Sequence, residues 1–238
     1  MERSAFEQAG DLLRQAVRLD PGYAPAHVAV ANWYSLRIGQ GWSPDPASDT
    51  RALEAMALAA IGMDSGSGRA LAMLAHNRTI LRREYDEALV LIDRALDASP
   101  NDAEAWMWSS PTYAYIGDPG EALRRAERAI ALSPEDPFMF RYEHFRSIAH
   151  YAAADYEEAA YWGTRSLRGN PHYTSNLRLT AAALVGLGRT AEVRPLVDKV
   201  MELQPAFRIT PMIARQAFRD DTLREQFARH LEAAGLPR

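Results

Sequence analysis

A repeat of about 34 residues is the feature that most limits how this chain can fold. One position of each repeat is usually a proline, and we call this position the anchor. The anchors are Pro21, Ser65, Pro100, Pro134, Pro171 and Pro205. The intervals between them are 44, 35, 34, 37 and 34 residues. A period of this length is typical of solenoids, whose units bury their apolar faces only by stacking on neighbours. We therefore expect one continuous array over residues 1–238.

The segments before the anchors have the apolar spacing of amphipathic helices. In residues 85–96 (YDEALVLIDRAL) and 120–132 (GEALRRAERAIAL), apolar side chains recur at i, i+3, i+4 and i+7. Proline then ends the helix, because it has no N–H to donate to the preceding turn. Sustained alternation with period two, which would indicate strands, does not occur. The pattern predicts an all-α protein.

Small residues recur at fixed distances from the anchors and indicate close contacts between helices. Most anchors are preceded at five residues by a small side chain. The residues at this distance are Ala16, Ala60, Ala95, Ala129, Ser166 and Val200. Twelve residues before four of the anchors stand Ala9, Ala88, Ala122 and Ala159.

Composition excludes several classes of protein. The chain has 27 Lys and Arg against 31 Asp and Glu, a net charge of −4, and no cysteine. Without cysteine there can be no disulfide framework, zinc–thiolate site, iron–sulfur cluster or thiol nucleophile. Lys199 is the only lysine, which leaves no lysine for a phosphate-binding loop of the Walker type. Mild acidity spread over the chain argues against direct contact with nucleic acid.

The sequence contains no evident targeting or membrane segment. Residues 1–17 mix acidic and basic side chains and lack the apolar core of a signal peptide. No stretch approaches the ~18 apolar residues of a membrane span. We expect a cytoplasmic protein that makes no membrane contact.

The repeat resembles the tetratricopeptide repeat, a helix-turn-helix unit of 34 residues with a pattern of aromatic, small and proline positions. Two segments, 103–136 and 174–207, match it best. In the first, the matching residues are Trp106, Ser110, Tyr113, Gly117, Ala122, Ala126, Ala129 and Pro134. In the second they are Leu177, Ala181, Leu184, Gly188, Val197 and Pro205.

This resemblance implies a right-handed α-solenoid with a C-terminal capping helix. The expected segments are a half repeat at 1–23, a repeat at 24–67 with an insertion at 39–49, repeats at 68–102, 103–136, 137–173 and 174–207, and a cap at 208–238. In this frame the chain starts with the second helix of a repeat. The lone helix indicates either a fragment of a longer protein, which we favour, or a half-repeat cap.

The last segment predicts one more helix. Thr222 is the expected N-cap, Glu225 completes a capping box, and Gly235 and Pro237 end the helix. The narrow stripe of Leu223, Phe227 and Leu231 favours capping of the array over recruitment of a partner.

Two segments show a closer resemblance, to the C-terminal tetratricopeptide region of bacterial signalling proteins. They are the Trp-containing insertion at 40–49 and the ending at 211–237, with Phe-Arg-Asp at 218–220 and Ala-Gly-Leu-Pro at 234–237. In that group the repeats follow a class III adenylate or guanylate cyclase domain or a winged-helix DNA-binding domain. The resemblance implies a sensor or scaffold region of a larger signalling or transcription-regulating protein, although neither output domain is present in the sequence.

The resemblance also implies a concave groove that takes an extended peptide or a partner helix. The candidate contact residues are Asn32, Ser35, Asn77, Met107, Tyr115, Arg141, His144 and Arg178. Insertions leave two positions ambiguous, so that His76 is an alternative to Asn77, and Arg141 and His144 are alternatives to each other. The family's clamp for a terminal carboxylate is incomplete, because Val28, Glu104 and Trp108 stand where cations are expected. A protein or peptide partner remains the expectation, with homodimerisation as the alternative.

Trp42 in the insertion is a further candidate contact. An indole among Gly39, Gly41, Pro44 and Pro46 must pack back on the array or wait for a partner, and we favour the first.

No residue pattern indicates catalysis, a cofactor or a metal. Residues 66–69 (GSGR) resemble a phosphate-binding loop only superficially, and a turn between repeats explains them better. His144 and His150 are six residues apart and fall on different helix faces.

Overall fold

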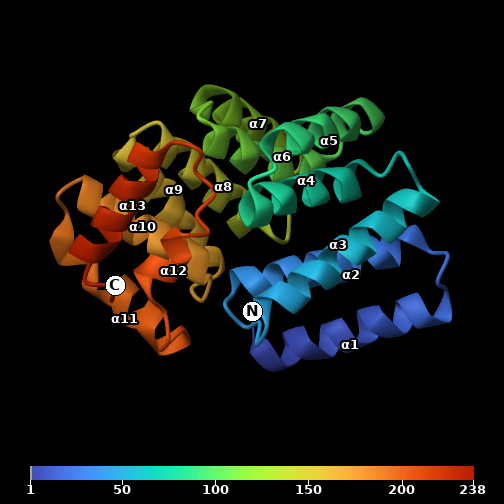
Figure 1. Ribbon diagram of the computed structural model, residues 1–238, viewed down its shortest axis with the longest axis horizontal. Coiled ribbons are helices and arrows are strands. Elements are labelled where there is room, and N and C mark those ends of the chain that lie inside the picture. Colours follow the sequence, from blue (N-terminus) through green and yellow to red (C-terminus); the bar gives the residue numbers. More distant parts are fainter. Residues whose placement is uncertain (1) are drawn as a thin grey trace.

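A computed structural model describes residues 2–238, which are folded almost wholly into helices (Figure 1). The first seven helices are α1 (Arg3–Leu19), α2 (Ala24–Gly39), α3 (Pro46–Met63), α4 (Gly68–Arg82), α5 (Tyr85–Ala98), α6 (Ala103–Ile116) and α7 (Pro119–Leu132). The remainder are α8 (Met139–Ala152), α9 (Tyr156–Gly169), α10 (Thr174–Gly186), the 3₁₀ helix η1 (Thr190–Glu192), α11 (Arg194–Leu203), α12 (Ile209–Ile213) and α13 (Asp221–Ala233).

The helices pack in the order of a solenoid. Each pair from α2 and α3 to α10 and α11 forms a helical hairpin, and the inner helices α4, α6, α8 and α10 pack on one another in turn. Figure 1 shows α1–α3 at one end, α8–α13 at the other, and α4–α7 joining them. The predicted right-handed α-solenoid with a C-terminal helix is confirmed.

The anchors of the repeat fall where the sequence pattern places them. Each lies two residues beyond the last residue of α1, α3, α5, α7, α9 or α11. The small residues before them explain how the helices approach: Ala60, Ala95, Ala129 and Val200 have no exposed surface. Ala9 in α1 is exposed, because this helix has solvent on its outer side.

The insertion after α2 is shorter than predicted. Only residues 40–45 form a loop, and residues 46–49 are the first turn of α3. Asp45 is the reason, since its side chain accepts hydrogen bonds from the backbone N–H groups of Ala47 and Ser48 and so caps the helix at that point.

The predicted capping box of the last helix is wrong by two residues. Asp220 is the N-cap, and its carboxylate accepts a hydrogen bond of 2.8 Å from the N–H of Thr222. Aspartate is a stronger cap than threonine, so the helix begins at Asp221. Gly235 ends this region with a φ of 98°, as predicted for a glycine stop.

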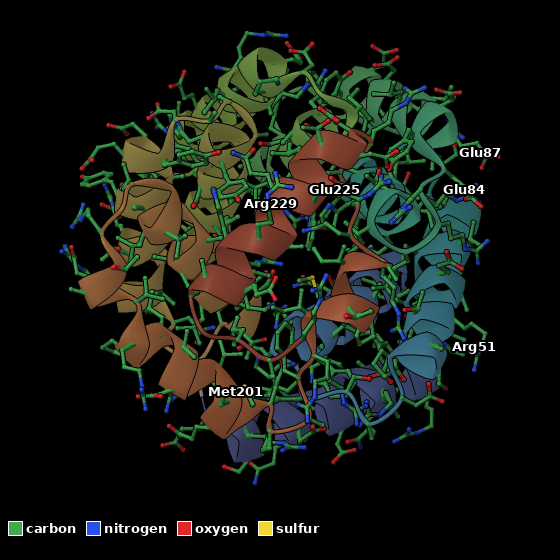
Figure 2. The ribbon with its side chains drawn as sticks, turned by 60° about the vertical axis from the view of Figure 1, so that its left-hand side comes forward. Arg51, Glu84, Glu87, Met201, Glu225 and Arg229 are labelled. Atoms are coloured by element: carbon green, nitrogen blue, oxygen red, sulfur yellow. The ribbon has the colours of Figure 1, made fainter. Side chains whose placement is uncertain are left out.

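The array curls so far that its first full hairpin, α2 and α3, contacts the later helices α8 and α10. Arg141 of α8 donates a hydrogen bond of 2.6 Å to Asn32 of α2, and the hydroxyl of Thr174 donates one of 3.0 Å to the carbonyl of Gly39. A small core seals this contact; it contains Phe6, Trp33, Leu36, Trp42, Phe140 and Tyr173. Figure 2 shows the helices running round in a ring, with α13, marked by Glu225 and Arg229, lying across its front.

The closed shape is evident in the surface area. The accessible surface is 10623 Å², close to the ~10,700 Å² expected for a compact monomer of this mass. Within residues 2–238, no helix has the length and apolar character needed to cross a bilayer.

Gly68 at the start of α4 provides a test of the hairpin packing. A Cβ atom here would lie 2.7 Å from the backbone carbonyl oxygen of Ala95, so Gly68→Ala must push α4 away from α5. We expect the free energy of unfolding to fall by ~1–3 kcal/mol in urea titrations. Gly62→Ala is the matched control. A Cβ at Gly62 meets no atom within 4 Å, so this change should stabilise the protein by ~0.5–1 kcal/mol. If Gly68→Ala and Gly62→Ala changed the free energy of unfolding equally, the close packing of α4 on α5 would be contradicted.

Candidate functional site

The C-terminal segment, residues 204–219, lies over the concave side of the array. The N–H of Arg219 donates a hydrogen bond of 2.7 Å to the carbonyl of Tyr115 in α6, and the hydroxyl of Tyr85 donates one of 2.7 Å to the carbonyl of Ala217. The ring of Phe218 packs edge-on against that of Tyr115 at 5.2 Å. The groove expected from the sequence is therefore covered by the chain itself.

What remains of the groove is a cavity of about 490 Å³. Side chains from the inner helices α2, α4, α6, α8 and α10 form its wall, and the C-terminal segment closes another side. The wall includes Ser35, His76, Asn77, Trp108, Tyr115, His144, Phe145, Tyr173, Arg178, Gln204, Phe207, Arg208, Met212, Arg215 and Phe218. This volume lies within the range of ~300–1,000 Å³ found for small-ligand sites.

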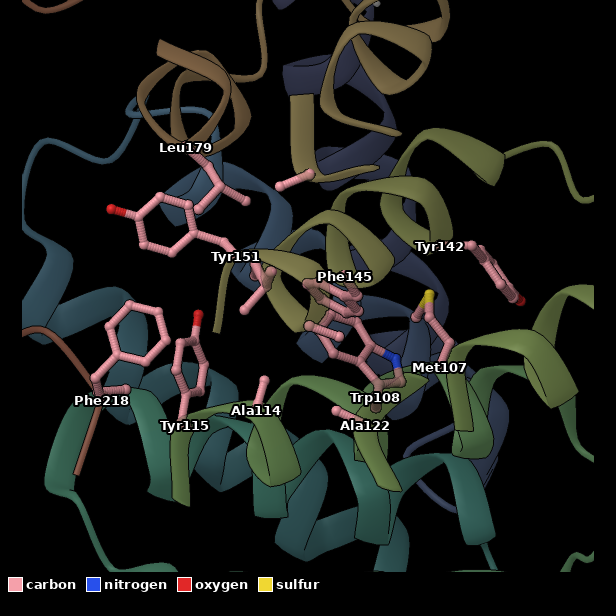
Figure 3. Close-up of a cluster of buried hydrophobic side chains, with 14 of the residues drawn as sticks. Met107, Trp108, Ala114, Tyr115, Ala122, Tyr142, Phe145, Tyr151, Leu179 and Phe218 are labelled. Atoms are coloured by element: carbon pink, nitrogen blue, oxygen red, sulfur yellow. The ribbon is translucent and has the colours of Figure 1, made fainter. Parts of the chain in front are cut away.

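Aromatic rings make up much of the wall. The ring of Trp108 lies 5.5 Å from that of Phe145 and 5.1 Å from that of His76. Figure 3 shows Trp108 beside Phe145 and, further along, Tyr115 beside Phe218. These rings pack on one another and are nearly buried, and they make the cavity lining largely apolar.

The charge on the wall is of one sign. Arg178, Arg208 and Arg215 line the cavity, and no Asp or Glu does. None of the three forms an ion pair within 4.0 Å among residues 2–238. The guanidinium of Arg178 donates a hydrogen bond of 2.8 Å to Gln204 and lies 5.1 Å from the ring of Phe207. Burial lowers the pKa of Arg178 to about 10, so it is charged at pH 7.

A fourth cation lies behind the wall. Arg141 is 1% exposed and lies between the rings of Trp108 and Phe138, at 5.2 and 4.9 Å. Among residues 2–238 the guanidinium forms one hydrogen bond, to Asn32, and its Nε and Nη2 atoms have no partner. Burial lowers its pKa, opposed by the more distant carboxylates of Glu104 and Asp136.

The two histidines of the wall are uncharged near neutral pH. Burial lowers the pKa of His76 to about 3, with a further lowering from His144 and Arg141. Burial likewise lowers the pKa of His144 to about 3, against the opposing effect of its hydrogen bond to Asn176. The positive charge of the cavity therefore comes from arginine.

The structure separates the predicted contact residues into two groups. Five line the cavity: Ser35, Asn77, Tyr115, His144 and Arg178; His76, the alternative to Asn77, lines it too. The other three, Asn32, Met107 and Arg141, do not, because Asn32 and Arg141 bond to each other and Met107 is 1% exposed in the core.

For Trp42 the structure has the alternative favoured from the sequence, packing back on the array, and it does not have the candidate contact. Its ring is 8% exposed and packs edge-on against that of Phe6 at 5.2 Å. Trp42 therefore packs back on the array and presents no free surface for a partner.

Sequence reasoning missed the residues that the C-terminal segment supplies. The sequence pattern places Arg208 and Arg215 in the C-terminal cap at 208–238, yet both line the cavity. The available signal was local: residues 204–219 hold three arginines and no acidic residue, which is unusual in an acidic chain.

The buried histidines predict a loss of stability in acid. In the unfolded chain a histidine binds a proton below pH ~6.5, whereas His76 and His144 stay neutral in the folded protein until about pH 3. Each should therefore lower the free energy of unfolding by ~2 kcal/mol between pH 7 and pH 5, measured by urea unfolding. His76→Phe should remove about half of the combined loss of stability that His76 and His144 cause between pH 7 and pH 5. Phe145→Leu, a packing control, should lower stability equally at both pH values. An unchanged pH dependence in His76→Phe would contradict the buried, neutral state.

Two comparisons of the sequence with known proteins found no match for this chain. No family model matches it, and no curated protein matches it.

Solved structures do resemble it. Cut9, in the APC/C hetero-tetramer Cut9–Hcn1, has a TM-score of 0.62 at 14% identity, covering 98% of this chain and 44% of that one. PilW, a type IV pilus biogenesis factor, has a TM-score of 0.58 at 16% identity, and the match covers 86% of this chain and 93% of PilW. A tetratricopeptide repeat protein from Parabacteroides merdae has a TM-score of 0.50 at 14% identity, and the match covers 98% of this chain and 93% of that protein. These similarities show that the chain has the tetratricopeptide-repeat fold.

Proposed function

We propose that this chain is a protein-interaction module whose concave side is its binding side. One observation carries the proposal: side chains from five successive inner helices and from the C-terminal segment meet around one cavity. Convergence of polar groups on a concave, mostly apolar site is the usual sign of a binding site. Cut9, a structural neighbour, is found in a complex with Hcn1, which supports the choice of a protein as the partner.

The proposed setting is the cytoplasm, as the sensor or scaffold region of a larger bacterial signalling or transcription-regulating protein. Support comes from the resemblance of residues 40–49 and 211–237 to such regions. We propose the repeat boundaries predicted from the sequence, with the insertion after α2 shortened to residues 40–45. The net charge of −4 favours a protein or peptide partner over nucleic acid or a membrane.

The proposed contact residues are the five that line the cavity: Ser35, Asn77, Tyr115, His144 and Arg178. The cavity size limits what they can meet. A volume of about 490 Å³ admits a small part of a partner, such as one or a few side chains, while the C-terminal segment stays in place.

Selection from a displayed library of random peptides tests this proposal. Peptides enriched on the wild-type chain should bind Ser35→Trp at least tenfold more weakly, because the indole fills the cavity. Asn101→Trp, in an exposed turn, is the control and should bind them normally. Enriched peptides that bind all three proteins equally, or no enrichment at all, would refute the concave side as the peptide-binding side.

A second candidate function is self-association through α1. The outer side of this helix and the turn after it expose Leu12 (66%), Leu19 (78%) and Tyr23 (53%). Leu12 and Leu19 are seven residues apart and so share one helix face. An exposed apolar stripe of this kind is typical of a contact with another protein surface.

Sedimentation at varied concentration tests self-association. We expect a dimer for the wild type and a monomer for the double variant Leu12→Glu/Leu19→Glu. Val90→Glu, at a similarly exposed apolar residue of α5 (60%), should leave the dimer intact. A wild-type chain that stays monomeric up to high concentration would remove this candidate.

A further inference from the structure

We propose that the cavity binds a small organic anion with an aromatic or otherwise flat apolar body. The inference rests on the proposed function only in taking the concave side as the binding side. It adds the chemical class of the ligand: one anionic group, carboxylate or a similar acid, joined to a body that fits between aromatic rings.

The distribution of charge is the first argument. The chain as a whole has an excess of acidic groups, and many of its arginines contact a carboxylate, as Arg146 does with Glu127 at 3.1 Å. Arg178, Arg208 and Arg215 have no such contact within residues 2–238, and no acidic residue shares the cavity wall with them. A wall with three cations and no anion is complementary to an anionic ligand.

Burial is the second argument. Arg141 lies behind Trp108 with two nitrogen atoms that have no hydrogen-bond partner. Removing a guanidinium from water is costly unless a counter-charge is near, and Arg141 contacts no carboxylate within 4.0 Å in residues 2–238. An anion in the cavity would offset this cost through space, even without direct contact.

The apolar part of the wall specifies the ligand body. Trp108 and Phe145 form one side, and Tyr115 with Phe218 forms another. Flat rings pack well on flat surfaces, and the cavity of about 490 Å³ has the volume of a site for a small molecule. Inorganic phosphate or sulfate would meet the cations but leave these rings unused.

Three probes with the same body and different charge test the inference. They are naphthalene-2-carboxylate, naphthalene-2-carboxamide and 2-(aminomethyl)naphthalene, titrated into the full chain by calorimetry at pH 7. We expect the carboxylate to bind at least tenfold more tightly than the amide, and the amine to bind most weakly. Inorganic phosphate should bind more weakly than the carboxylate. Amide or amine binding as tight as carboxylate binding would overturn the inference.

Two variants locate the binding. Arg178→Gln keeps a polar side chain but removes a charge from the wall, and it should weaken carboxylate binding by about tenfold, the effect of one charge-assisted hydrogen bond. Arg194→Gln is the matched control, since Arg194 is exposed on α11 and pairs with Asp198; its affinity should equal that of the wild type. Helical circular dichroism shows whether both variants are folded. Equal weakening in both would place the anion elsewhere and overturn the inference.

The outcomes also separate this inference from the proposed function. If no naphthalene probe binds but selected peptides bind and Ser35→Trp abolishes that binding, the ligand class is wrong and the proposed function stands. If the carboxylate binds with the expected dependence on Arg178 and no peptide is selected, the small-anion site stands and the peptide partner is wrong.

Discussion

The structure depends on one constraint: a helical hairpin of this array exposes an apolar stripe that only a neighbouring hairpin can bury. Buried alanines such as Ala95 and Ala129 let the hairpins stack closely, and a small rotation from each repeat to the next makes the stacked array curl. Curling continues until α2 meets α8 and α10, where the hydrogen bond between Arg141 and Asn32 and the surrounding aromatic core hold the two parts together.

Closure changes what the concave side can do. An open solenoid presents a groove along which an extended partner can lie, whereas here the C-terminal segment is bonded to Tyr85 and Tyr115 across that side. Of the three arginines on the cavity wall, Arg178 is half-buried, whereas Arg208 and Arg215 are exposed to solvent. Aromatic walls and unpaired cations are then placed together, and this combination carries both the proposed binding side and the proposed ligand class.

The sequence predicted the repeated features well and the unique features poorly. Helix ends at the anchors follow from a local rule that applies at all six anchors, and the small residues before the anchors are buried in every repeat except that of α1. An error at one repeat is therefore visible by comparison with the others. The start of α13 depends on a single competition, between Asp220 and Thr222 as N-cap, and was misplaced. The placement of Arg208 and Arg215 depends on a long-range fold-back of the chain, and no periodic pattern encodes that. The ring closure through Arg141 and Asn32 was missed for the same reason, because residues 109 positions apart meet only when the curl of the whole array is known.

Closure of the array is the central claim, and small-angle X-ray scattering of the chain in dilute solution tests it most directly. A compact domain of 238 residues has an expected radius of gyration of about 18 Å. A measured value near this, with a scattering curve that matches the closed ring, is the result expected here. A radius larger by several ångströms, with the scattering of an elongated superhelix, would show that the array is open in solution and would contradict the closed ring of helices.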